Sequence, residues 1–178
     1  GNEGSCEPAK LFASTLPSSR SVQIADDGSA YATVINAGAN TGYGCTLTLS
    51  SDIPATLTSW ATDPATNKII SDQNPAVNIP AGGFATWVFR IAPSATIPPT
   101  DVELLYECAN SDPATVLPGI NTLLLSASDE PTPDIIAITL TATRDGILSV
   151  DGPQGSAAFA TATINVGASG STAVEPRL

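Results

Sequence analysis

Few side chains in this sequence of 178 residues could carry out catalysis, and histidine is absent. A Ser-His-Asp or Cys-His nucleophile is therefore excluded. A serine–lysine pair would need Lys10 or Lys68, and neither lysine lies in an S-x-x-K context. Glycoside hydrolysis needs only two carboxylates, and Glu103 and Glu107 are the best pair. Residues four apart on a strand are ~13 Å apart, too far for either glycosidase geometry, so we interpret this pair as a solvated acidic face and expect no enzyme activity.

Aspartates in predicted turns offer the oxygen ligands that Ca²⁺ prefers. Asp26 and Asp27 are the best candidates because they are adjacent in one turn. The spaced D-x-D-x-D pattern of a dedicated calcium loop is missing, and aspartate is also a common turn former. Calcium therefore stays an alternative, and no other cofactor is expected. The remaining turn aspartates are Asp52, Asp63, Asp72, Asp112 and Asp145.

The two tryptophans, Trp60 and Trp87, could stack on sugar rings. Trp87 alternates with Phe89 and Ile91, which predicts that it points into a hydrophobic core. Trp60 lies in a weaker strand pattern that is compatible with either a buried or an exposed position. Trp60 is therefore the candidate residue for a glycan ligand.

The three cysteines are Cys6, Cys45 and Cys108, and no CxxC pair occurs. Without histidine, a mixed zinc site is excluded. An exported protein with three cysteines is expected to contain one disulfide and one remaining thiol. The alternation of apolar residues in 45–50 and 101–108 places Cys45 and Cys108 on inward faces, so we expect these two to pair. Cys6, before the first predicted strand, is the competing partner.

Short strands must position these side chains. The 15 prolines and 14 glycines divide the chain into short runs rich in Val, Ile, Thr and Leu, and sustained helical periodicity is absent. This pattern predicts an all-β fold, an immunoglobulin-like antiparallel β-sandwich over residues 1–130, followed by a stiff Pro-containing linker. The expected strands are 9–16, 20–24, 30–36, 45–50, 57–62, 68–71, 84–91, 102–109 and 122–128.

A motif near the start of the chain recurs after residue 130. Residues 28–40 (GSAYATVINAGAN) match residues 155–169 (GSAAFATATINVGAS) with a two-residue insertion, which keeps every strand side chain on its own face. Upstream, 136–143 and 147–150 correspond to the two lead-in strands. Residues 131–178 thus predict the start of a second, incomplete sandwich, too small to bury both faces alone. Either the natural polypeptide completes this module, which we favour, or its strands dock on the first domain or on another chain.

The charge balance restricts both partners and location. The sequence has 6 Lys+Arg against 17 Asp+Glu, a net charge of -11, so nucleic acids and anionic membrane surfaces would be repelled. Charged residues make up only 13%, and a surface of Ser, Thr, Asn and Gly is typical of exported bacterial proteins. No run approaches the ~20 apolar residues of a membrane-spanning helix. We expect a secreted or cell-surface location and no membrane insertion.

Several short motifs lie between residues 22 and 128: ATVINAG at 32–38, CTLTL at 45–49, SDIPAT at 51–56, IPAGG at 79–83 and TWVF at 86–89. In these motifs the chain resembles bacterial immunoglobulin-like cell-surface repeat modules of the CARDB-like kind. The resemblance implies an extracellular setting and no catalytic residue, since such modules are mostly spacers and adhesion elements. Cys45, Trp60 and Tyr106-x-Cys108 also resemble the Cys…Trp…Cys pattern of true immunoglobulin domains, but the strand ending at Asn36 indicates that Cys45 lies one strand later than in those domains.

The sequence therefore predicts a non-catalytic structural or adhesive module of an exported bacterial protein. Its expected partners are other protein chains at exposed strand edges, or downstream repeats of the same protein. The alternative is a small binding module for a glycan or for calcium.

Overall fold

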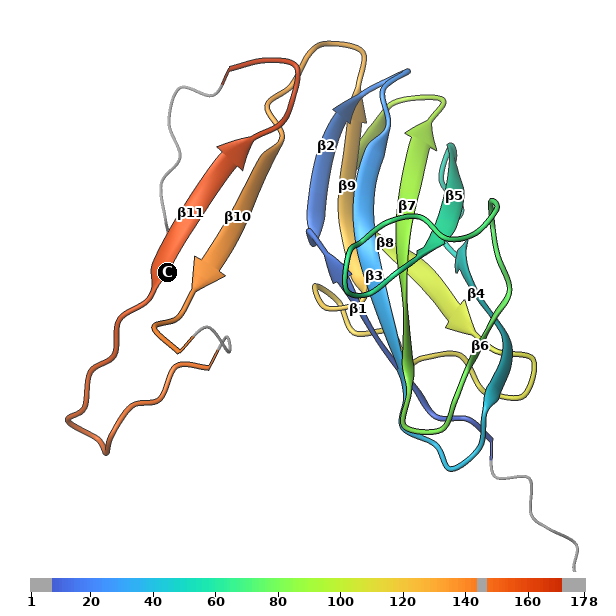
Figure 1. Cartoon of the computed structure of the whole chain (residues 1–178). Coiled ribbons are helices and arrows are strands. Elements are labelled where there is room, and N and C mark those ends of the chain that lie inside the picture. Colours follow the sequence, from blue (N-terminus) through green and yellow to red (C-terminus); the bar gives the residue numbers. More distant parts are fainter. Residues whose placement is uncertain (1–7, 144–146, 171–178) are drawn as a thin grey trace, which may run out of the picture.

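The computed structural model describes residues 8–143 and 147–170, and the regular structure within them consists of β-strands. Nine of these strands form two sheets that pack face to face as a β-sandwich (Figure 1). In spatial order, the first sheet contains β1 (Leu11–Leu16), β3 (Gly28–Asn36), β7 (Phe84–Pro93) and β5 (Ala55–Thr62). The second contains β2 (Ser19–Gln23), β9 (Thr122–Ser128), β8 (Ile97–Glu107), β4 (Gly42–Leu49) and β6 (Val77–Ile79).

The sandwich forms because its strands alternate between buried and exposed side chains. In β3, for example, Ala30, Ala32 and Val34 are buried while Tyr31 and Ile35 are exposed, so one face of the sheet covers the core. Small aliphatic residues fill most of the space, and a few large side chains occupy the centre. The largest fully buried side chains are Trp87, Tyr106, Phe89, Leu47, Ile79 and Ile91.

The chain changes sheets between its first two strands, at the cis Leu16–Pro17 peptide. β1 pairs antiparallel with β3 in the first sheet, whereas β2 pairs parallel with β9 in the second. All other named pairings of the sandwich are antiparallel. The expected all-β antiparallel sandwich is therefore confirmed, with one parallel pair at the edge of the second sheet.

Three strand predictions were wrong in detail. The expected strand 68–71 is only an isolated bridge between Ile69 and Thr62, and the edge strand that does form is β6, nearby in the chain. The expected strand 102–109 begins earlier than predicted, because β8 also includes Pro98 and Pro99. There the register with β9 shifts between Ile97 and Thr100, since proline cannot donate to the ladder. Residues 147–150, expected to match the second lead-in strand, form no strand.

A two-stranded hairpin follows the sandwich and stands beside β2 (Figure 1). β10 (Ile135–Leu140) and β11 (Ala160–Asn165) pair antiparallel, from Ile135 opposite Asn165 to Leu140 opposite Ala160. Most of its side chains are exposed, so the hairpin has no hydrophobic core among the described residues. Nor does the described part of the chain hold a helix of the length and apolarity needed to cross a bilayer.

Candidate functional site

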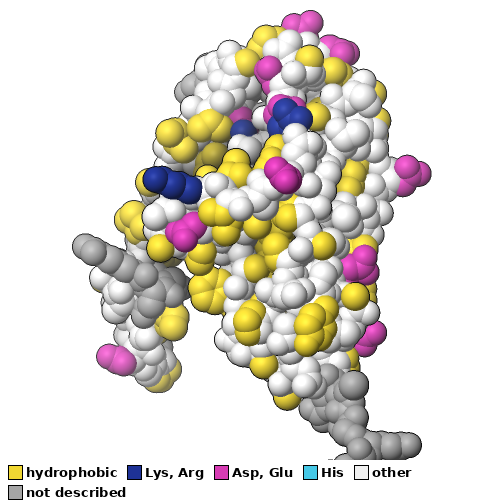
Figure 2. Space-filling view, turned by 45° about the vertical axis from the view of Figure 1, so that its right-hand side comes forward, with side chains coloured by type: hydrophobic (Ala, Val, Ile, Leu, Met, Phe, Trp, Pro, Cys, Tyr) yellow, Lys and Arg dark blue, Asp and Glu magenta, His cyan; other side chains and the backbone are white. Residues whose placement is uncertain are grey.

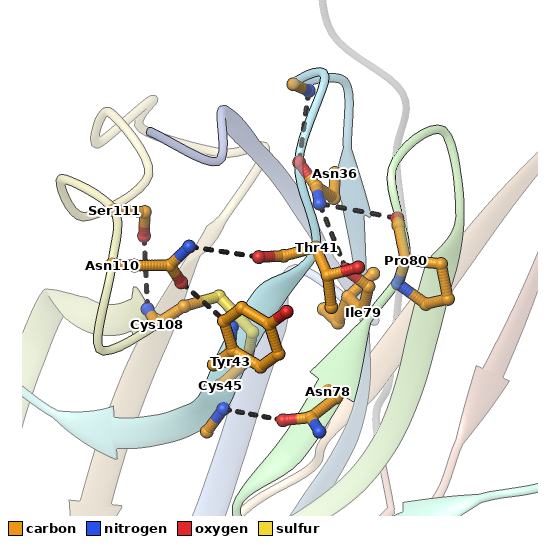
Figure 3. Close-up of a disulfide and its surroundings, with 12 residues drawn as sticks. Asn36, Thr41, Tyr43, Cys45, Asn78, Ile79, Pro80, Cys108, Asn110 and Ser111 are labelled. Carbon is orange, nitrogen blue, oxygen red and sulfur yellow. Dashed lines mark hydrogen bonds between the residues drawn. A yellow bond between two sulfur atoms is a disulfide. The ribbon is translucent and has the colours of Figure 1, made fainter. Parts of the chain in front are cut away.

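A disulfide joins Cys45 in β4 to Cys108, one residue beyond the end of β8 (Figure 3). β4 and β8 are neighbours in the second sheet, and both cysteines are buried. The predicted pairing across neighbouring core strands is confirmed. The competing residue, Cys6, lies outside the described residues.

The surroundings of the disulfide explain a glycine and an asparagine in the sequence. A Cβ atom on Gly42 would lie 2.8 Å from Sγ of Cys108 and 3.0 Å from Sγ of Cys45, so the bond requires a glycine at that position. The side chain of Asn110 accepts from the backbone N–H of Tyr43 (2.9 Å) and donates to the carbonyl of Thr41 (2.9 Å; Figure 3). These contacts tie the loop after β8 to the start of β4.

Asn36, at the end of β3, is fully buried and organises the same end of the sandwich. Its Oδ1 accepts from the backbone N–H of Gly38 (3.0 Å) and of Lys10 (3.3 Å). Its Nδ2 donates to the carbonyls of Asn40 (2.8 Å) and Ile79 (3.0 Å). The side chain thus joins β3 to β6 (Figure 3) and also holds Lys10, the residue before β1. We call this arrangement the asparagine corner.

The hairpin contains a second asparagine corner, centred on Asn165. Oδ1 of Asn165 accepts from the N–H of Gly167 (3.0 Å) and of Asp134 (3.0 Å), and Nδ2 donates to the carbonyl of Ser169 (2.7 Å). Each of these bonds has its counterpart around Asn36. A Cβ at either motif glycine would collide with backbone: 2.7 Å from Lys10 N at Gly38, and 2.4 Å from Asp134 N at Gly167. The spacing Asn-x-Gly is therefore required in both places.

Tyr106 crosses the core and links the two sheets. Its hydroxyl forms a 2.6 Å hydrogen bond with Oγ1 of Thr15 in β1, and both residues are buried. Burial raises the pKa of Tyr106 to about 12, while the hydrogen bond with Thr15 acts in the opposite direction. The phenol therefore keeps its proton in the folded state at a pH where an unfolded tyrosine loses it.

This shift predicts a loss of stability in alkali. Because the folded-state pKa lies above the unfolded value of about 10, the contribution is complete below pH ~10 and disappears as the pH rises toward ~12. Between pH 9 and 11 the free energy of unfolding should fall by about 1.4 kcal/mol through this group. Urea unfolding at pH 9 and at pH 11 measures this change in the free energy of unfolding. Tyr106→Phe should lack the part of the change that comes from the tyrosine hydroxyl. Equal decreases in the two proteins would contradict the assignment.

An ion pair joins the hairpin to the sandwich. Oδ2 of Asp134 accepts from Nε of Arg20 at 2.7 Å, and Oδ1 accepts from the backbone N–H of Ser21 at 3.0 Å. The side chains are only 10% and 3% exposed. A small cavity of about 240 Å³ lies beside the pair, between residues 20–27 and 166–168. We call the contact of Asp134 with Arg20 and Ser21 the joint. Arg20 also donates to Ser29, so its guanidinium is held from both sides.

Trp60 lies half-buried on the outer face of the first sheet, whereas Trp87 is completely buried, as expected. The strand register places Trp60 opposite Val88, Val88 opposite Tyr31, and Tyr31 opposite Leu16. Tyr31 is 47% exposed and Leu16 is 69% exposed. One apolar row therefore crosses all four strands of the sheet. Its members are Leu16, Tyr31, Val88 and Trp60.

Two further rows run beside the apolar row. The neighbouring row carries only hydroxyl side chains, and beyond it lies a second, shorter apolar row. Within the hydroxyl row, Thr62 and Thr86 share a 2.8 Å hydrogen bond. The face in view in Figure 2 shows hydrophobic side chains along its middle and most of the acidic ones toward its margins. The hydroxyl row is Ser14, Thr33, Thr86 and Thr62, and the second apolar row is Phe12, Ile35 and Phe84.

The calcium candidates are not brought together. Asp27 forms a 2.9 Å ion pair with Arg90, and Asp26 is exposed in the turn after β2. Asp63 accepts from the side chain and backbone of Thr66 and from the backbone of Ala65, and these hydrogen bonds lower its pKa. Within residues 8–143 and 147–170, no three Asp, Glu, Cys or His side chains are close enough to hold a metal ion. Asp145 lies outside the described residues.

Glu103 and Glu107 both lie on the outward face of β8, four residues apart. Glu103 is opposite Thr122 and Glu107 is opposite Thr46, so neither faces a second carboxylate across the sheet. A cavity of about 650 Å³ lies at the edge of the sandwich beside β1. Lys10, Asp112 and Asn121 are among its lining residues, and it contains neither glutamate.

Comparisons with known proteins identify no family. No family model matches the chain, and no curated protein matches its sequence. One similar structure is a family 123 glycoside hydrolase from Clostridium perfringens, studied for glycolipid glycan hydrolysis, at 11% identity and a TM-score of 0.40 over 66% of this chain. The chain spans only 27% of that enzyme. Another is AvmM, which catalyses macrocyclisation in alchivemycin A biosynthesis, at 13% identity and a TM-score of 0.36, with 92% of each chain covered. Neither likeness is close enough to carry a function.

Sequence reasoning missed the joint, the apolar row and the bond between Tyr106 and Thr15. The repeated segment that contains Asn-x-Gly was visible in the sequence, but the hydrogen bonds of the two asparagine corners were not predicted. Arg20 could have been noticed as one of only 6 basic residues. Its partner Asp134 is more than a hundred residues away, and nothing in the local pattern links the two.

Proposed function

We propose that this chain is a non-catalytic structural module of an exported bacterial protein, with immunoglobulin-like topology and a partial second copy. The carrying observation is the repeated asparagine corner. The bonds of Lys10, Gly38 and Asn40 around Asn36 reappear as those of Asp134, Gly167 and Ser169 around Asn165. Structural repeats of this kind are the units of extended surface proteins.

The strand order supports the immunoglobulin-like topology. Naming β1, β3, β4, β5, β7, β8 and β9 as A to G gives one sheet in the order A-B-E-D and a second that contains G-F-C. This is the arrangement of constant-type immunoglobulin domains. β2 and β6 are additional edge strands. The disulfide joins strands C and F of one sheet, instead of strands B and F across the core.

The pairing of the hairpin supports the second copy. Residues 11–16 pair with 31–36 in the sandwich, and residues 135–140 pair with 160–165 in the hairpin, each over six residue pairs. The first backbone bond beyond the pairing is also the same, from the N–H of Ala37 to the carbonyl of Lys10 and from Val166 to Asp134. Residues 1–130 and 131–178 are thus proposed as two modules of one kind.

The exposed hairpin supports the proposed partners. Ile138, Leu140, Phe159 and Ile164 are each more than half exposed, and two strands alone cannot bury such side chains. Further strands of the same protein, or strands of another chain, would cover them at the open edges. A disulfide, a net charge of -11 and the resemblance to CARDB-like modules favour a secreted or cell-surface location.

The joint gives this proposal a direct test. A structural module should hold the next module in a fixed orientation. Here the buried pair of Arg20 and Asp134 would fix the orientation of the hairpin relative to the sandwich. In Arg20→Ala, the carboxylate of Asp134 would stay buried without an opposite charge, with only the backbone N–H of Ser21 as its donor from the sandwich. The hairpin should therefore detach and let the carboxylate return to water. In ¹⁵N relaxation measurements we expect order parameters near about 0.85 for the hairpin amides of the unchanged chain, falling below about 0.6 in the variant.

The matched control is Arg90→Ala, which removes the exposed ion pair with Asp27 at 2.9 Å. Exposed pairs contribute little, and neither Arg90 nor Asp27 bonds to Asp134, so the hairpin order parameters should not change. Low order parameters for the hairpin amides in the unchanged chain would contradict the proposal that the joint fixes the hairpin.

A further inference from the structure

We propose that the outer face of the β1–β3–β7–β5 sheet binds a neutral polysaccharide, with Tyr31 and Trp60 as its stacking residues. The inference deepens the proposed function and rests on it, because it names the ligand by which a non-catalytic surface module would adhere. Three observations carry it: the charge of the face, its size and the order of its rows.

The charge of this face differs from that of the rest of the molecule. The sequence has 17 acidic residues, yet β1, β3, β5 and β7 contain none of them. Arg90 is the single charged residue in these strands, and Asp27 pairs with it at 2.9 Å. A face without net charge suits an uncharged ligand. The overall charge of -11 would repel an anionic polysaccharide and also a second copy of this chain.

The size of the face favours a narrow ligand over a protein. Four strands span roughly 14 Å across the sheet, and the three rows span roughly 13 Å along it. A strip of these dimensions is small beside a stable protein interface, which buries roughly 800 Å² of accessible surface per partner. A polysaccharide chain needs only a strip of this width.

The order of the rows matches the chemistry of a sugar ring. A pyranose has an apolar C–H face and a rim of hydroxyl groups. Tyr31 and Trp60 would stack on C–H faces, and the accessible hydroxyls of the row, Ser14 and Thr33, would meet the rim as donor and acceptor. At the other end of the row Thr62 is buried and bonded to Thr86. Val88 lies between the two aromatic residues in the register, so the aromatic side chains are two strands apart, roughly 10 Å. They can therefore contact different sugar units of one polysaccharide.

Affinity electrophoresis tests the proposal with four soluble neutral polysaccharides: xylan, galactomannan, β-1,3-glucan and hydroxyethylcellulose. We expect at least one to retard the full chain and polygalacturonate, an anionic control, not to. Tyr31→Thr and Trp60→Thr should each weaken binding about tenfold. Threonine is chosen because its strand propensity is high. An unchanged urea unfolding midpoint confirms that each variant is folded.

The matched control is Tyr43→Thr, because Tyr43 is 55% exposed on β4 in the other sheet. It should bind like the unchanged chain. The proposal is overturned by retardation with none of the four polysaccharides, by equal losses in all three variants, or by light scattering that shows a dimer abolished by Tyr31→Thr. Polysaccharide binding and hairpin relaxation are separate readouts, so this inference can fail while the structural proposal stands.

Discussion

Removing the bond between Cys45 and Cys108 is expected to lower the free energy of unfolding by about 4 kcal/mol. The two residues are 63 positions apart, and closing a loop of that length restricts the unfolded chain strongly. The loop includes β5, β6 and β7, which contribute to both sheets. The double variant Cys45→Ala/Cys108→Ala, compared with the unchanged chain by urea unfolding without reductant, measures the effect.

Cys6→Ala is the matched control, since it removes a thiol and leaves the bridge in place. It should unfold at the same urea concentration as the unchanged chain. Thiol titration of the denatured, unreduced protein should find one free thiol in the unchanged chain and none in Cys6→Ala. A stability loss below about 1 kcal/mol in the double variant would contradict the loop-closure argument.

Local patterns predicted much of the sandwich. Alternation gave the inward faces of β4 and β8, and from them the disulfide, because side chains on one face of neighbouring strands must meet. It also separated Trp87, which follows a strict two-residue period with Phe89, from Trp60, which does not. Two-residue periodicity is a property of one strand, so it can be read without knowing the partners of that strand.

The remaining features depend on partners far away in the sequence. β6 has three residues, too few for a pattern, and forms only because β4 offers an open edge. The apolar row joins four strands through a register that no single strand encodes. The joint pairs Arg20 with Asp134 across 114 positions. Local sequence therefore indicated single faces, while the candidate binding face required the register of the whole sheet.

Asn36→Ala should lower the free energy of unfolding by about 3 kcal/mol. The change removes one acceptor and one donor group from a buried position, so the N–H of Gly38 and the carbonyl of Ile79 lose their partner away from water. Asn165→Ala deletes the matching bonds at an exposed corner, where water can replace them. That loss should stay below about 0.5 kcal/mol.

Asn36→Asp separates hydrogen bonding from packing, because aspartate has nearly the same volume as asparagine. It keeps the acceptor for the N–H groups of Gly38 and Lys10 but places a carboxylate against the carbonyl oxygens of Asn40 and Ile79. At neutral pH its urea midpoint should be at least as low as that of Asn36→Ala, since a buried carboxylate oxygen that faces carbonyl oxygens costs more than a missing side chain. A midpoint close to that of the unchanged chain would mean that Asn36 only fills space. The hydrogen bonds shared by the two asparagine corners would then no longer support a repeated module.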